Sequence, residues 1–461
     1  MDSRFRGNDG GHMDSRGADK SAPYSVNDGP LDTEHALERA IGVRGLAATA
    51  FNVTVGGGIF VLPAVVAAAI GPSAPVAYLV VAAAMGLIVL CFAQAGSRVS
   101  LTGGPYAYVE IALGKYVGFL VGTLLWLVGT TATAAVGSAF IGSIAVFWAP
   151  LAQPIPRALI LALVFVLFGA LNIRGTRQST RFLELVTIVK LLPLIVFVVI
   201  GAALAHGGAP DVFGNLAPAK LGRSVIVLIF AFAGIEFALV PSGEVKDPAR
   251  TVPRALFMAM TAITILYVSI QYVAQMILGP QLALEQAAPL TSAARAVAGS
   301  GGAIFIGVCA SISMFGYVSG MMLTAPRALY AFGRDGILPP IFARIHRKYD
   351  TPAVAIAAQC TMTFIVAVTG GFAELAILSN IAVLVLYLFC CISAWELRRR
   401  NVQAGGTPFR IPGGAAVPFL AVVVILWILS NATVKEFSVI GGVLVVASGL
   451  FLVAPRRARS A

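Results

Sequence analysis

The sequence has few charged side chains. Asp, Glu, Lys and Arg make up 11% of the 461 residues, whereas 58% are hydrophobic and the mean hydropathy is +0.90. A soluble globular domain carries about 25% charged residues, so water cannot solvate a surface this poor in charge and lipid must take its place. Backbone polar groups in lipid have to pair within helices or closed barrels. The apolar runs are about 20 residues long rather than alternating segments of about 10, which predicts an all-α integral membrane protein.

Histidine and cysteine are also scarce. The histidines lie in predicted tails or loops, and the cysteines lie inside apolar runs, with no metal-type spacing and no sign of a disulfide framework. A membrane-embedded enzyme needs histidines, paired acids or metal ligands within its spans. We therefore expect no metal site, no cofactor and no enzymatic activity. The residues are His12, His35, His206 and His346, and Cys91, Cys309, Cys360, Cys390 and Cys391.

Hydrophobic runs between charged, proline or glycine positions predict about 12 transmembrane helices. Of the 32 Lys and Arg, 26 fall in the tails and even-numbered connections, 5 in the odd-numbered connections and one, Lys190, inside a span. By the positive-inside rule, both termini are cytoplasmic and the chain is a multi-pass protein of the cell inner (plasma) membrane. The same distribution explains the net charge of +12 without any nucleic acid. The predicted spans are 44–70, 74–97, 116–148, 157–173, 179–205, 223–243, 253–279, 299–331, 353–370, 374–397, 416–432 and 437–454.

The first 40 residues contain no apolar core. We expect a disordered cytoplasmic tail there, without a cleavable signal peptide. Met-Asp-Ser-Arg occurs at Met1 and again at Met13, so the translation start stays open between the two.

Two predicted spans contain glycines where a helix is easily interrupted. The first has Gly56, Gly57 and Gly58 near its middle, and each costs a helix about 1 kcal/mol relative to alanine. The triplet is explained either by a close helix crossing or by an unwound segment whose N–H groups face an anion. The sixth span has Gly234 two residues before the intramembrane acid Glu236, which favours the unwound segment. Spans five apart run in opposite directions, so the breaks predict an inverted repeat with a midplane site.

Lys190 is the remaining intramembrane charge. It lies roughly 16–18 Å from the cytoplasmic end of the fifth span, too deep to snorkel comfortably. Burial favours the neutral amine, which makes Lys190 a candidate proton carrier. The alternative is a permanently charged lysine that tethers unwound carbonyls of the first span.

Motifs along nearly the whole chain from about Leu37 resemble those of the amino acid–polyamine–organocation superfamily. The order of the motifs and their positions at span ends carry the resemblance better than any single match. They are Gly56-Gly57-Gly58-Ile59-Phe60 (G-[S/A]-G-[I/V]-F), Thr102-Gly103-Gly104-Pro105-Tyr106-Ala107-Tyr108 (T-G-G-x-Y-x-Y), Phe232, Gly234 and Glu236 (F-x-G-x-E), Glu244 to Pro253 (E-x-K-[N/D]-P-x-R-x-x-P), Arg327 with Tyr330 (R-x-x-Y), and Arg334 to Pro339 (R-D-G-x-x-P).

The resemblance implies a leucine-transporter-type fold with two inverted five-helix repeats, 41–205 and 206–397, followed by two extra helices and a basic C-terminus in 398–461. It also implies a site for a small amino acid, with Lys190 at the position where the proton-coupled branch carries a lysine. The intramembrane acid Glu236 is our second candidate coupling residue, and the resemblance implies a role in internal packing or gating for its carboxylate. The implied carboxylate donors are the amides of Gly56, Gly57 and Gly58. The implied carbonyls around the amino group are those of Val53, Thr54, Phe230, Ala231 and Ala233, and the predicted substrate site also includes Phe232, Gly234 and Ile235.

Two departures from the family pattern bear on this site. Gly57 stands where relatives often have serine or alanine, so a hydroxyl contact is missing, and Ser242-Gly243-Glu244 has one acid where many members have two. For the side-chain pocket we expect small and apolar lining residues, which favours a neutral amino acid. The candidates are Gly129, Thr130, Thr133, Ile235, Ser311, Met314 and Asn380.

The function that follows from these residues is proton-coupled amino acid uptake by alternating access. An amino acid exchanger and a cationic amino acid or polyamine permease are the alternatives. A transport-derived sensor would need a sizeable soluble domain, and the connections here are short. The oligomeric state stays open.

Overall fold

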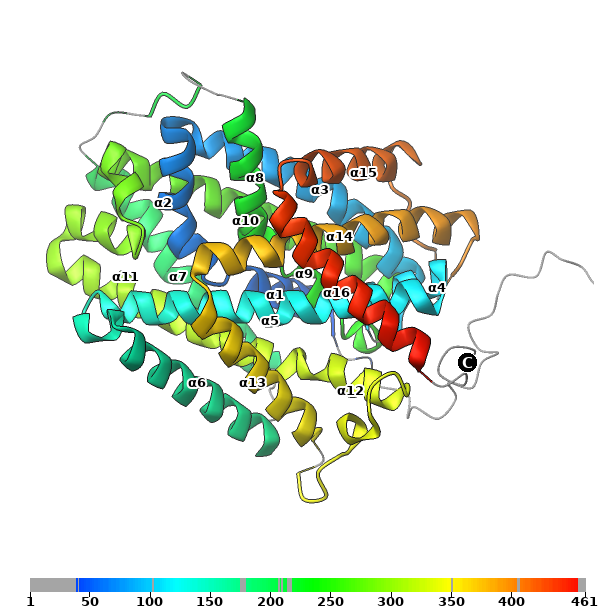
Figure 1. Ribbon diagram of the computed structural model, residues 1–461. Helices are drawn as coiled ribbons and strands as arrows, with labels where there is room; N and C mark the ends of the chain where they lie inside the picture. The colour runs from blue at the N-terminus through cyan, green and yellow to red at the C-terminus, as the bar shows by residue number, and fades with distance from the viewer. Residues whose placement is uncertain are drawn as a thin grey trace, which may run out of the picture.

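The computed structural model describes residues 41–101, 103–174, 180–205, 218–349, 351–403 and 407–454, together with residues 39, 208 and 210–213. The predicted disordered tail lies almost entirely outside these residues, as does Thr102 of the second motif. Every regular element in the described part is helical, apart from an isolated bridge between Ile41 and Val245. The predicted all-α fold is therefore confirmed (Figure 1).

The α-helices are joined by short turns and five short 3₁₀ segments. Their bounds are α1 Val43–Thr54, α2 Gly58–Ile70, α3 Ala74–Arg98, α4 Pro105–Leu113, α5 Lys115–Ala145, α6 Pro154–Arg174, α7 Thr180–Leu204, α8 Pro218–Phe232, α9 Ile235–Ala238, α10 Pro248–Leu278, α11 Pro289–Thr324, α12 Pro326–Arg334, α13 Ala353–Thr369, α14 Phe372–Arg399, α15 Ala416–Leu429 and α16 Val434–Val453.

Helix length and composition mark the chain as a multi-pass membrane protein. In the described residues, eight stretches are long and apolar enough to cross a bilayer, and three further apolar helices are shorter. Large apolar side chains point outward along α6 and α16; Leu159, Val166 and Val445 are 65%, 68% and 71% exposed. Such a surface suits lipid rather than water.

The centre of the bundle is formed by the long helices α3, α5, α10 and α14. Helix α5 packs against α14 and α11, and α3 packs against α10 (Figure 1). Their facing residues form one continuous apolar core that runs through most of the bundle. The two interrupted spans lie against this scaffold, since α1 packs on α10 and α7, and α8 packs on α2, α3 and α14.

The structure divides both glycine-containing spans where the sequence predicts. The predicted span 44–70 forms α1 and α2, separated by Val55, Gly56 and Gly57, and Val55 leaves the helical region with ψ of 83°. The predicted span 223–243 ends as a helix at Phe232 and resumes as the single turn α9 after Gly234. Gly234 has φ of +125°, a conformation that side chains with a Cβ rarely adopt. The break therefore depends on glycine at that position.

The predicted bounds need one further correction. The span expected at 299–331 starts ten residues earlier, at Pro289, and bends at Ala298 and Gly299 before it runs on to Thr324. The motif after the second span leads into the short helix α4, which lies in the connection between the predicted spans 74–97 and 116–148. Proline at the first position of α4 suits a helix start, because its missing N–H would be unpaired there.

Candidate functional site

The two helix breaks touch each other. A methyl group added at Gly58 would lie 3.2 Å from both Ala231 Cα and Phe230 Cδ1, and one added at Gly234 would collide with the carbonyl group of Val53. Both glycines are thus needed for the backbones to approach this closely. Residues about 180 positions apart in sequence form a single junction at the centre of the bundle.

The junction brings unpaired donors next to unpaired acceptors. Among the described residues, the amides of Gly57, Gly58 and Ile59 at the start of α2 have no acceptor, as expected for a helix N-terminus. The Gly56 amide differs from the expectation, because it already donates to the Thr54 carbonyl at 2.9 Å. A carboxylate placed here would therefore meet Gly57, Gly58 and Ile59 rather than the predicted glycine triplet.

The acceptors lie at the end of α8. Among the described residues, the carbonyl oxygens of Phe230, Ala231, Phe232 and Ala233 accept no hydrogen bond, because Gly234 donates its amide to Glu236 instead of continuing the helix. The end of α8 carries the negative pole of a helix and the start of α2 carries a positive pole. A zwitterion bound between them would place its carboxylate at the positive pole and its ammonium group at the negative pole.

A small cavity, with free space for about one water molecule, lies at this junction. Eight of its lining residues are among those predicted for the site or for coupling, and the rest come from α5, α9, α11 and α14. The predicted ones are Thr54, Gly56, Gly57, Gly58, Phe230, Ala233, Gly234 and Glu236, and the others are Val128, Ala132, Val136, Phe237, Tyr317 and Ser379.

Two polar atoms in the cavity wall have no partner among the described residues. Glu236 is fully buried; its Oε2 accepts the Gly234 amide at 2.9 Å and the Tyr387 hydroxyl at 2.7 Å, while its Oε1 has none. Thr54 Oγ1 is likewise buried without a partner. Burying an unpaired polar atom costs about 1–3 kcal/mol, so both atoms are available to a ligand or a water.

Lys190 does not line this cavity but contacts the end of α1. The side chain is 3% exposed, and its Nζ donates to the side-chain and backbone oxygens of Asn52, at 2.5 Å and 3.3 Å. Asn52 belongs to the last turn of α1, where a cation interacts favourably with the helix dipole. This contact is the one that the tethering role predicts. It also holds a protonatable amine against Asn52, which lies two residues before Thr54 in α1.

Four other predicted site residues lie outside the cavity lining. Phe232 is fully buried and packs against the rings of Tyr78 and Tyr267, at centroid distances of 6.4 Å and 5.3 Å. Val53, Ala231 and Ile235 are adjacent to lining residues, and the first two contribute backbone to the junction. Phe230 does line the cavity, and its ring packs edge-on against Phe372 at 5.4 Å.

The predicted side-chain pocket needs a larger correction. The face of α5 toward the cavity is Val128, Ala132 and Val136, whereas Gly129, Thr130 and Thr133 lie on other faces of that helix. Thr130 and Thr133 hydroxyls donate to carbonyls one turn earlier in α5. Ser311 and Met314 on α11 do not line the cavity either; Tyr317, one turn after Ser313, does. Candidates chosen one residue before Gly129 and Thr133 would have lain on the face toward the cavity.

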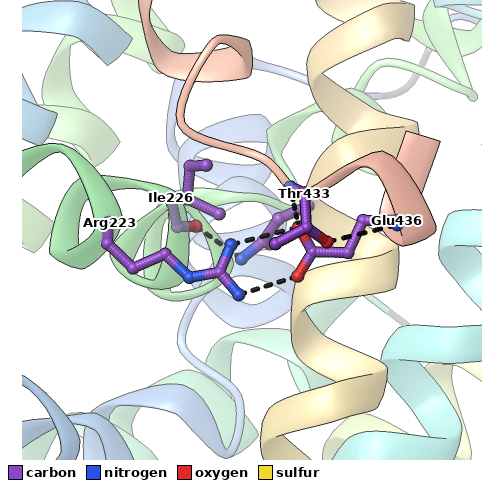
Figure 2. A network of polar contacts seen from close by, with 5 residues as sticks. Arg223, Ile226, Thr433 and Glu436 are labelled. Atoms are coloured by element: carbon purple, nitrogen blue, oxygen red, sulfur yellow. Dashed lines mark hydrogen bonds and ion pairs between the residues drawn. The ribbon is translucent and has the colours of Figure 1, made fainter.

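Asn380 anchors α8 instead of lining the pocket. Its Nδ2 donates to the Ile226 carbonyl at 2.7 Å. On the same part of α8, the Arg223 guanidinium binds both carboxylate oxygens of Glu436 at 2.7 Å and 3.1 Å, beside the Thr433 cap of α16 (Figure 2). Helix α8 is thus held from α14 and from α16, which positions the carbonyl end that faces the cavity.

Together, the fold and the site define a multi-pass membrane protein with a central cavity between two broken helices, whose ends present polar backbone groups. A family model described as amino acid permease matches residues 41–451. The chain therefore belongs to the amino acid permease family, within the amino acid–polyamine–organocation superfamily.

Individual relatives cover nearly the whole chain. It is 26% identical to the methylthioribose transporter of Bacillus subtilis (strain 168), over 87% of this chain and 91% of that protein. It is 26% identical to the branched-chain amino acid permease BcaP of the same organism, over 86% and 89% of the two chains. It is 28% identical to the large neutral amino acids transporter small subunit 2 of Rattus norvegicus, over 84% and 74%.

Proposed function

We propose that this permease is a secondary active transporter that carries a neutral amino acid across the cell membrane by alternating access. The observation that carries the proposal is the junction of the two breaks, where unpaired amides at Gly57 and Gly58 face unpaired carbonyls at the end of α8 across one cavity. The α-carboxylate would bind the amides and the α-amino group the carbonyls. Hydrogen bonds to charged groups contribute about 1.5–3 kcal/mol each.

The chemistry of the cavity wall supports a neutral, modestly apolar side chain. Val128, Ala132, Val136 and Phe237 are apolar, and Glu236 has one of its two carboxylate oxygens already engaged. Relatives are named as a branched-chain amino acid permease and a large neutral amino acids transporter. A relative named as a methylthioribose transporter makes a thioether sugar a second candidate, because that molecule also joins polar groups to a small apolar end.

Helix pairing supports twelve spans with inverted five-span repeats. In this numbering the spans are α1 with α2, α3, α5, α6, α7, α8 with α9, α10, α11, α13, α14, α15 and α16. Exchanging the first five spans with the second five maps the contact of α1 with α10 onto that of α8 with α3, and the contact of α5 with α14 onto that of α11 with α7. This pattern is expected of two repeats in opposite orientation.

Residue positions also support the proposed orientation. The ends of α3, α12 and α14 carry Arg98, Arg334, Arg398, Arg399 and Arg400, which suits the cytoplasmic side. Both termini would then be cytoplasmic, as the distribution of Lys and Arg indicates.

Proton coupling through Lys190 is the proposed energy source. The ammonium binds Asn52 in the last turn of α1, and the junction begins at the next residue, Val53. Deprotonation would weaken the attraction between the lysine and the end of α1 and so change the geometry of the cavity. Exchange is the competing mode, supported by a relative named as a serine/threonine exchanger, at 25% identity over 87% of this chain.

The test uses purified protein in proteoliposomes. A thermal-shift screen with leucine, serine, lysine and methylthioribose selects the ligand, and uptake of its labelled form is measured with an inward proton gradient, with no gradient, and with internal unlabelled substrate. We expect gradient-driven uptake that Lys190→Ala abolishes and that Lys220→Ala, a substitution of an exposed lysine on α8, leaves intact. Uptake that needs internal substrate and ignores the gradient would show exchange, and gradient-driven uptake that survives Lys190→Ala would exclude Lys190 as the coupling residue.

A further inference from the structure

Three arginines converge at one end of the bundle, away from the cavity. Arg98 is the last residue of α3, Arg398 lies in the last turn of α14, and Arg410 lies in the connection between α14 and α15. Arg98 donates to the Val402 carbonyl, four residues after Arg398, and Ser97, next to Arg98, accepts the amide of Phe409, next to Arg410. We call these three residues the arginine cluster.

The positive charge of the cluster is not balanced within the described part of the chain. No carboxylate there pairs with any of the three arginines. The neighbouring acid, Glu396, is already occupied, since it accepts from Arg399 at 2.8 Å and 2.9 Å and from Arg400 at 2.6 Å. Like charges held together without a counter-ion repel one another.

Arg98 is the decisive member, because it is buried. Its side chain is 4% exposed; Nη1 donates to the Val402 carbonyl at 3.0 Å, and Nε has no partner in the part of the chain that the structure describes. Arg398 Nη1 is buried without a partner as well. A buried charge is strongly unfavourable unless an ion of opposite sign pairs with it. The two unpaired nitrogens are therefore free to donate to an anion.

The surrounding backbone holds the cluster in place. Ser97, next to Arg98, accepts the Phe409 amide at 3.0 Å, and Gln94 donates to the Ala394 carbonyl at 2.8 Å. These contacts fix α3 to α14 and to the connection that carries Arg410. A site held in advance loses less conformational entropy when its ligand binds.

We propose that the arginine cluster binds the phosphate of an anionic phospholipid in the adjoining leaflet. Guanidinium groups bind phosphate oxygens in a planar, bidentate geometry, and basic pockets between transmembrane helices recognise anionic head groups. The adjoining surface favours a phospholipid head group over free phosphate as the bound anion. Trp395, three residues before Arg398, is 51% exposed, and α15, which packs on both α3 and α14, presents Phe419 and Leu420 at 71% and 48% exposure for acyl chains.

The test measures lipid binding by purified full-length protein and does not depend on transport. Protein in a neutral detergent is titrated with dioleoylphosphatidylglycerol, dioleoylphosphatidylcholine or inorganic phosphate, with thermal stability and native mass spectrometry as readouts. We expect the phosphatidylglycerol to stabilise the protein and stay bound, and the phosphatidylcholine to do neither. The double variant Arg398→Gln with Arg410→Gln should weaken phosphatidylglycerol binding at least tenfold and leave the buried Arg98 in place.

The matched control is Arg347→Gln, which removes an exposed arginine from the connection between α12 and α13. Its phosphatidylglycerol affinity should stay within twofold of the wild type. Equal stabilisation by inorganic phosphate, with no further gain from lipid, would overturn the lipid assignment. Phosphatidylglycerol binding that is the same in the double variant, the control and the wild type would overturn the site.

Discussion

Replacing Gly234 by alanine tests the central contact of the site. Gly234 has φ of +125°, and an added Cβ would lie 2.8 Å from the Val53 carbonyl carbon and 3.0 Å from Thr54 Cα. Carbon atoms in contact normally stay about 3.5–4.0 Å apart. The end of α1 and the turn before α9 would therefore have to separate by about 0.5–1 Å, in addition to the strain of a positive φ.

The two costs can be separated with other glycines of this chain. The backbone strain alone is about 1–3 kcal/mol for a residue with a Cβ, and Gly71 isolates it, because it has φ of +58° with nothing within 4 Å of an added Cβ. Gly86 lies in helix α3 with equally open space and an ordinary φ, so alanine there should be neutral or stabilise by up to about 1 kcal/mol.

Thermal stability and substrate binding are measured for Gly86→Ala, Gly71→Ala and Gly234→Ala. We expect stability to fall in that order. Substrate affinity should stay at the wild-type value for the first two variants and fall at least tenfold, about 1.4 kcal/mol, for the third, because only Gly234 touches the backbone that would bind the amino group. If Gly234→Ala matches Gly71→Ala in both stability and affinity, the two breaks do not meet as described.

Three further changes test individual groups of the site. Tyr387→Phe removes the hydroxyl that donates to Glu236 Oε2 at 2.7 Å, and should destabilise the protein by about 1.5–3 kcal/mol; an unchanged thermal transition would exclude that bond. Thr54→Val removes an unpartnered buried oxygen without changing shape, so stability should rise by about 1–3 kcal/mol while substrate affinity falls about fivefold, or roughly 1 kcal/mol; isothermal titration calorimetry measures the affinity, and an unchanged value rules out a contact. A double-mutant cycle of Arg223→Gln and Glu436→Gln should give a coupling below about 1 kcal/mol, because the side chains are 38% and 18% exposed; a coupling above about 3 kcal/mol would contradict this.

The breaks could be predicted from the sequence because their cause is local. Three consecutive glycines, and a glycine two residues before a buried acid, weaken a helix whatever packs around it. The same holds for the apolar runs, whose length and poverty in charge define a membrane protein without any knowledge of contacts. The position of the two breaks in oppositely directed spans, five apart, then predicted one shared site, and the family resemblance implied the same pairing.

The lining of the cavity could not be predicted in this way. Successive residues of a helix point about 100° apart, so Val128 and Gly129 face different neighbours, and only the packed bundle decides which of them meets the cavity. Tyr317 and Ser379 were missed for the same reason. Asn380 was a reasonable candidate as a polar residue within a span, but the structure uses its amide to hold α8.

One consequence of the geometry concerns how a proton could affect a substrate that it never touches. The end of α1 is held from two sides, by Lys190 through Asn52 and by Gly234 against Val53. A cation at a helix C-terminus contributes about 0.3–1 kcal/mol, and up to about 2 kcal/mol when partly buried, and the proposed deprotonation of Lys190 would remove that contribution. Because α1 leads directly into the amides of Gly57 and Gly58, a shift of its end changes the substrate site within one turn. A coupling energy of about 1–2 kcal/mol changes affinity roughly 5- to 30-fold, which is enough for protonation and substrate binding to favour the same state.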